Sequence, residues 1–139
     1  MSSYDSDVEA LAAITKTALG LSESDVQDIG AHDPELWELV EEQIGEDVQI
    51  WISWLRWAVQ FDKSAGMALY FDEFAVNVRQ YHQSTFAECL ENAKTVRNAL
   101  SGAQWYKDGI LRTAVVSDGV PLVSNNSDVK TIQMIVSIR

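Results

Sequence analysis

The residue types that support chemistry are few in this sequence and widely spaced. Residues 62–73 have the length of a twelve-residue calcium loop, with Asp62 at the first position and Glu73 at the last. The fifth position is Gly66 instead of an oxygen-bearing side chain, and the sixth, where the sharp turn needs glycine, is Met67. The segment therefore predicts a plain turn between two elements rather than a calcium site.

Histidine and cysteine offer no better metal or nucleophilic site. His32 and His82 lie fifty positions apart, and neither has a cysteine or a second histidine at ligand spacing. Cys89, the only cysteine, would lie about 10 Å from His82 on a shared helix, which is too far for a nucleophile and its base. We expect Cys89 to be a small buried hydrophobe. A single cysteine excludes an intrachain disulfide, and we expect neither a metal nor another cofactor.

Paired carboxylates, Glu41-Glu42 and Asp72-Glu73, are the remaining candidates for acid–base chemistry. Catalytic carboxylates are held by rigid, partly buried neighbours, whereas these lie in an acidic run or at an expected helix start. The glycines stand singly, so the chain has no glycine-rich phosphate loop. The sequence therefore predicts a protein that is not an enzyme.

The net charge of −11 is divided unevenly along the chain. Residues 1–55 carry thirteen acidic side chains and one basic one, Lys16, a charge of −12, whereas residues 56–139 carry eight acidic and nine basic ones, a charge of +1. An acidic field disfavours nucleic acid and anionic membrane as partners and favours a basic protein surface. It also fits a solvated face that only keeps the protein soluble.

The elements that must position any functional side chain begin with helices. Ser6 and Glu9 form a capping-box pattern that predicts a helix over residues 7–19, which Gly20 ends. Ser22 predicts a short second helix ending near residue 29, and Asp33, followed by proline, predicts the start of a third.

The third helix would carry an acidic ridge. Its glutamates recur at positions i, i+3, i+7 and i+11, on one face. Like charges at these spacings destabilise an isolated helix by about 0.2–0.5 kcal/mol per pair. Neither burial nor capping explains this row of glutamates, whereas binding to a basic partner would explain it. The ridge consists of Glu35, Glu38, Glu42 and Glu46.

Residues 50–61 hold three of the five tryptophans, and the rest of the chain is expected to pack around them. Apolar residues at i, i+4, i+7 and i+11 predict a helix, with Trp54 and Trp57 facing the core. Trp51, on a second stripe, and Trp37, beside the acidic ridge, are equally candidates for partner contact, because tryptophan is enriched among binding hot spots. The main stripe consists of Ile50, Trp54, Trp57 and Phe61.

A near-helical period continues through residues 72–100, which predicts one long helix with a kink around residues 80–84. Beyond it, β-branched residues predict a strand over residues 110–117, a hairpin turn at Asp118-Gly119 and a return strand over residues 120–123, where Pro121 requires an edge. Alternation over residues 129–139 predicts a half-buried strand. Its apolar face carries Ile132, Met134, Val136 and Ile138.

We therefore expect a mainly α fold of the α+β type, a bundle of four or five helices with one long helix and a small C-terminal antiparallel β element. Residues 1–104 would form the helical domain, and residues 105–139 a β extension packed on it or on a neighbouring subunit. No window approaches the roughly 18 unbroken apolar residues of a membrane span. The polar, acidic start of the chain lacks the pattern of a signal peptide.

Two functions based on protein–protein association fit these features. The first is a structural subunit of an oligomeric assembly, a homo-oligomer in its simplest form. A helical body with a β arm and no enzymatic motif is similar in layout to head–tail connector or adaptor proteins of tailed bacteriophages, which implies a protein that is cytoplasmic or assembled in a virion. The second is an acidic inhibitor, such as an immunity or anti-defence protein, that covers a basic active site or nucleic-acid-binding groove. The partner-contact candidates are Glu35, Trp37, Glu38, Glu42, Glu46, Trp51, Ile132, Met134, Val136 and Ile138.

Overall fold

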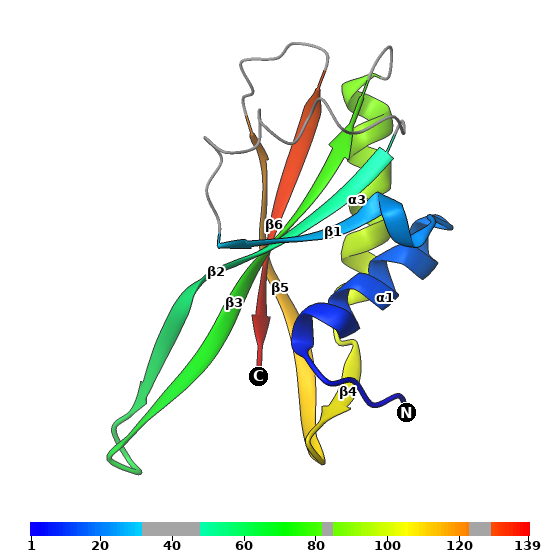
Figure 1. The fold of residues 1–139 in the computed structure, drawn as a ribbon. Helices are drawn as coiled ribbons and strands as arrows, with labels where there is room; N and C mark the ends of the chain where they lie inside the picture. Colours follow the sequence, from blue (N-terminus) through cyan, green and yellow to red (C-terminus); the bar gives the residue numbers. More distant parts are fainter. Residues whose placement is uncertain (32–47, 82–84, 123–128) are drawn as a thin grey trace.

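The computed structural model describes residues 1–31, 48–81, 85–122 and 129–139. Within these ranges the chain forms one six-stranded sheet with strand order β1-β2-β3-β6-β5-β4, and two α-helices cover one of its faces (Figure 1). The expectation of a bundle of four or five helices is therefore wrong. The strands that follow residue 104 belong to the same sheet as those that precede it.

Helix α1, Asp7–Leu19, has the bounds that the sequence predicts. The Ser6 hydroxyl accepts a hydrogen bond from the Glu9 N–H (3.1 Å), and Gly20, in the left-handed conformation at φ 65°, ends the helix. Ala10 and Leu11 are fully buried and pack against the core of the sheet. Local signals suffice here because both caps and the apolar spacing lie in one continuous segment.

The next segment forms a single 3-10 turn, η1 (Glu23–Asp25), and then strand β1 (Val26–Ala31). The short helix predicted to run to about residue 29 is therefore wrong. Ser22 stands at the N-cap position of the turn, where its N–H (3.3 Å) and its hydroxyl (2.8 Å) both donate to the Asp25 carboxylate. β1 pairs in parallel with β2, and this pairing with a distant segment overrides the local helix preference.

The tryptophan-rich segment is strand β2 (Val48–Asp62), which pairs antiparallel with β3 (Met67–Gln80). The helix expected over residues 50–61 is therefore wrong. The helical pattern arises because a β-bulge interrupts the strand at Leu55. The extra residue shifts the alternation of side chains by one position, and four residues on the resulting face also match a helical stripe. This face of β2 carries Ile50, Ile52, Trp54, Trp57, Val59 and Phe61.

The long helix predicted over residues 72–100 is also wrong, because the segment is the end of β3 followed by helix α3 (Phe86–Leu100). Apolar residues recur four positions apart in both parts, as at Phe74 and Val78, and a spacing of four fits the period of a strand as well as that of a helix. β3 ends at Gln80, where the kink was expected, and the Thr85 hydroxyl caps α3 by accepting a hydrogen bond from the Glu88 N–H (3.2 Å).

The C-terminal part of the sheet consists of β4 (Gln104–Lys107), β5 (Ile110–Leu122) and β6 (Lys130–Ile138). The hairpin turn predicted at Asp118-Gly119 is wrong, because both residues lie inside β5. The β4–β5 turn is at Asp108-Gly109, where both residues have positive φ. β6 lies between β3 and β5, so it is a central strand and not the half-buried strand that its alternation suggests.

The core lies between the two helices and the sheet. Ile52 on β2, Val76 on β3 and Val96 on α3 are fully buried in it, and Trp105 on β4 closes one end. The predicted apolar face of β6 is confirmed, since its four residues all belong to this core. Those residues are Ile132, Met134, Val136 and Ile138.

Candidate protein–protein interface

The outer half of the β2–β3 hairpin extends beyond both helices and beyond the other strands (Figure 1). We call residues 54–62 and 67–72 the outer hairpin. Its large side chains are exposed, with fractions of 70% for Trp57, 68% for Tyr70, 61% for Phe61 and 60% for Val59. Monomeric proteins rarely expose apolar patches larger than a few hundred Å², and larger ones mark interaction sites. The outer hairpin is therefore the candidate interface.

The bulge at Leu55 determines which residues share a face of this hairpin. Trp54 and Trp57 lie three positions apart, a spacing that would place them on opposite faces of a regular strand. Instead their rings meet edge to face, with centroids 5.9 Å apart and planes at 81°. We call the exposed apolar residues on this face the hairpin stripe. It consists of Trp54, Trp57, Val59, Phe61 and Tyr70.

The hairpin stripe continues the face that forms the core. Phe74, opposite Trp54 on the same face, is buried under the helices, whereas Tyr70, four positions further out on β3, is exposed. One apolar face of the sheet is thus covered by α1 and α3 near the middle of the strands and left open along the outer hairpin. Its residue types are those of a buried surface, as expected of one that a partner covers.

A polar network fixes the base of the outer hairpin to the body of the protein. The Trp54 Nε1–H donates to Asp72 Oδ1 (3.3 Å), and Arg112 Nη2 lies 3.9 Å from Asp72 Oδ2. Arg112 also binds Asp7, in the first turn of α1, at 2.8 Å, and the Trp105 Nε1–H donates to the same carboxylate (3.0 Å). The hairpin, α1 and the β4–β5 hairpin are therefore linked through two aspartates.

The opposite face of the outer hairpin carries ionic and cation–π contacts. Arg56 Nε donates to Glu73 Oε1 (3.0 Å) across the two strands. The Arg139 guanidinium lies over the Phe71 ring, 5.0 Å from its centroid. These contacts rigidify the hairpin where it leaves the sheet.

The hairpin turn is organised by Asp62. Its Oδ1 accepts hydrogen bonds from the Ser64 hydroxyl (2.7 Å), the Ser64 N–H (3.0 Å) and the Ala65 N–H (3.3 Å). The bond from the Ser64 hydroxyl, followed by those from the two N–H groups, holds the pKa of the Asp62 carboxyl below its ordinary value. The turn predicted here is confirmed, although it joins two strands rather than two helices.

The burial of three tryptophans differs from what the helical pattern predicts. Trp51 is fully buried, with its Nε1–H donating to Gln49 Oε1 (2.9 Å) and the Arg79 guanidinium 4.0 Å from its ring centroid. Its role in partner contact stays a prediction that this buried position does not support. Trp54 and Trp57, expected in the core, are exposed by 38% and 70%, and that expectation is wrong.

The other predicted contact residues lie either in the core or outside the described residues. The third helix, Trp37, His32, His82 and the acidic ridge of Glu35, Glu38, Glu42 and Glu46 all lie outside the described residues. The β6 candidates lie in the core, where Met134 is 2% exposed. The acidic surface therefore stays a sequence-based prediction.

Cys89 is fully buried, as expected. Its thiol lies 3.7 Å from the Val78 carbonyl and 3.6 Å from the Lys130 carbonyl, and burial raises its pKa above the ordinary value. Within the described ranges, His, Cys, Asp and Glu form no group of three that would hold a metal ion. In the same ranges, no helix is long and apolar enough to span a membrane.

Sequence reasoning missed the exposed residues Val59, Phe61 and Tyr70. A signal for them exists in the alternation of Trp57, Val59 and Phe61 with smaller or polar residues, which is a strand period. The strand period is hard to recognise because the bulge brings Trp54 and Trp57 to one face, and their spacing of three residues also fits a helix.

The comparisons with known proteins extend to the fold alone. No protein-family model matches the sequence, and no curated protein does. The fold is similar to that of a chain in a solved structure described as the virion of a native gene transfer agent particle, with a TM-score of 0.53 and 18% sequence identity. The similarity covers 95% of this chain and 90% of that one.

Proposed function

We propose that this chain is a non-enzymatic structural subunit of a virion-type protein assembly, and that the outer hairpin is its contact with neighbouring subunits. The observation that carries the proposal is the hairpin stripe, an apolar face that extends beyond the body of the protein and is exposed to solvent. The similarity to a chain of a gene transfer agent virion supports it, because that chain is part of a virion particle.

The exposed area is of the size that an interface uses. Trp57, Tyr70 and Phe61 are 70%, 68% and 61% exposed. Since an aromatic side chain buries about 150–250 Å² when fully covered, these three offer roughly 400 Å². A stable interface buries about 800 Å² per partner. Three side chains therefore supply about half of one partner's share, and the rest of the stripe and its edges adds to it.

The outer hairpin is also prepared for binding before the partner arrives. The edge-to-face contact of Trp54 with Trp57 and the hydrogen bond of Trp54 to Asp72 hold two of the aromatic rings in place. Binding by ordered side chains loses less conformational entropy than binding by mobile ones. The hydrogen bond from Trp54 to Asp72 thus raises affinity by ordering a side chain of the interface before binding.

Native-mass measurement over a concentration series tests the proposal, comparing the wild type with Trp57→Ser. We expect the wild type to associate and the variant to associate at least about tenfold more weakly, as for a hot-spot tryptophan. A wild type that stays monomeric at every concentration, and instead binds a basic protein more tightly at low salt, would support the alternative of an acidic inhibitor.

A further inference from the structure

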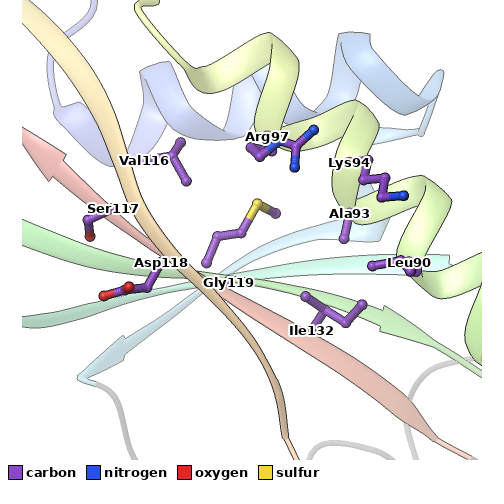
Figure 2. Close-up of a pocket in the computed structure, with 10 residues that line it drawn as sticks. Leu90, Ala93, Lys94, Arg97, Val116, Ser117, Asp118, Gly119 and Ile132 are labelled. Atoms are coloured by element: carbon purple, nitrogen blue, oxygen red, sulfur yellow. The ribbon is translucent and has the colours of Figure 1, made fainter.

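A groove lies between helix α3 and the outer edge of β5. Its volume is about 240 Å³. Figure 2 shows Leu90, Ala93, Lys94 and Arg97 of α3 on one side, Val116, Ser117, Asp118 and Gly119 of β5 on the other, and Ile132 of β6 between them. The lining is mainly apolar, and Lys94 and Arg97 bring positive charge to it.

Gly119 keeps this groove open. Its backbone does not need glycine, because its φ is not among the positive values in the described chain. A Cβ added at Gly119 would lie 3.9 Å from Met134 Cγ, an ordinary van der Waals contact, and a longer side chain would extend from it into the groove. The absent side chain leaves a hollow that a ligand group can enter.

The edge of β5 beside the groove is poorly suited to the addition of a strand. β4 pairs with β5 only over residues 110–113, and beyond Ala114 no further described strand lies on that side. A bulge at Ser117 and Pro121, which lacks an N–H, interrupt the free edge, and both are devices that limit strand addition. The groove is therefore a site for an inserted side chain.

The size of the groove fits one aromatic ring. A cavity of about 150 Å³ lined by apolar side chains holds benzene, so 240 Å³ admits a phenyl ring with room for its backbone link. Phe61, next to the hairpin turn, presents such a ring. It is 61% exposed and stands directly opposite the small Ala68 on β3.

We infer that this groove receives the end of the β2–β3 hairpin of a second copy of the chain, with the Phe61 ring placed over Gly119. The inference rests on the proposed function and names the partner surface for its hairpin. Charges at the two surfaces match, because Asp62, next to Phe61, can face the basic side chains of Lys94 and Arg97. Hairpin and groove are different surfaces of one subunit, so the contact is head to tail and repeats from copy to copy.

Cysteine cross-linking tests the contact in the full chain. Cys89 is buried, so oxidation of a mixture of Lys63→Cys and Leu90→Cys proteins, both of which keep Phe61, reports only the engineered thiols. We expect a disulfide-linked dimer to form at least about tenfold faster than in a mixture of Lys63→Cys with Ile110→Cys, although Ile110, on the other hairpin, is more exposed (63%) than Leu90 (36%). Equal rates in the two mixtures overturn the inference.

A second variant closes the groove. We expect Gly119→Leu to unfold at the denaturant concentration of the wild type but to associate at least about tenfold more weakly, whereas Val120→Leu, at the next position on β5 and facing the other way, associates normally. If Trp57→Ser weakens association and Gly119→Leu does not, the proposed function stands and the groove inference is wrong. If the wild type does not associate at all, both are wrong.

Discussion

Asp7 and Arg112 are 105 positions apart in the sequence, and their side chains lie 2.8 Å apart in the structure. Asp7 is 4% exposed and also accepts the Trp105 Nε1–H, so one carboxylate joins the start of α1 to both strands of the β4–β5 hairpin. Through Arg112 and Asp72 the same network reaches Trp54 at the base of the outer hairpin.

Asp7→Asn is expected to destabilise the fold by about 2–3 kcal/mol, because it removes the buried charge that Arg112 binds at 2.8 Å and leaves Arg112 only Asp72, at 3.9 Å. Urea denaturation of the variant should show a lower midpoint with an unchanged slope. Glu9→Gln removes a charge from the same helical turn and serves as the control. An equal loss of stability in both variants would mean that the loss comes from the charge at the helix terminus and not from the contacts of Asp7 with Arg112 and Trp105.

Trp57→Ser is expected to separate assembly from stability. Trp57 is 70% exposed, so its replacement should lower the free energy of unfolding only by about 1 kcal/mol, through loss of the edge-to-face contact with Trp54. Its loss from an interface should cost about 2 kcal/mol, or roughly thirtyfold in affinity. Sedimentation at several concentrations measures the second quantity. Ile110→Ser, an equally exposed apolar position on the β4–β5 hairpin, should leave association unchanged.

Deletion of Leu55 should be tolerated, because this residue is the extra one at the bulge. The remaining residues then alternate regularly, and Trp54 and Trp57 stay on one face. Deletion of Ala58 should instead move Val59 and Phe61 to the opposite face and weaken association. The exciton couplet of the paired indoles in far-ultraviolet circular dichroism should survive both deletions. Its loss on deletion of Leu55 would contradict the assigned register.

The carboxyl of Asp62 should titrate below an ordinary aspartate in the folded protein. A folded pKa below the unfolded value means that the ionised form stabilises the turn above the unfolded pKa and that this contribution is lost as the pH falls through the folded pKa. Ser64→Ala should raise the Asp62 pKa toward its ordinary value, because the Ser64 hydroxyl makes the largest contribution. NMR titration of the carboxyl carbon measures it, and Lys63→Ala should leave it nearly unchanged.

The Cys89 thiol should react slowly with alkylating reagents in the folded protein and at a normal rate in denaturant. Burial raises its pKa, so little thiolate forms near neutral pH, and the side chain is enclosed by β3, β6 and α3. Because the folded pKa is above the unfolded one, the corresponding stability is complete below the unfolded pKa and is lost as the pH rises through the folded pKa. Fast labelling of the folded protein would show that α3 opens locally.

The sequence by itself determined what depends on neighbouring residues. Ser6, Glu9 and Gly20 delimit α1, the single cysteine excludes an intrachain disulfide, and the alternation of residues 132–138 assigns one face of β6 to the core. The uneven distribution of charge is likewise a property of the sequence.

Only the tertiary structure decided whether the repeated spacing of four belonged to a helix or a strand. Phe74 and Val78 satisfy both periods, and the choice depends on pairing β3 with β2 and β6, segments that no local pattern identifies. The bulge at Leu55 places Trp57 on the same face as the core, but beyond α1 and α3, so it is exposed. Trp51, before the bulge, is buried on the opposite face. The outer hairpin became a candidate interface for the same reason, because the exposure of a strand depends on where the covering helices end.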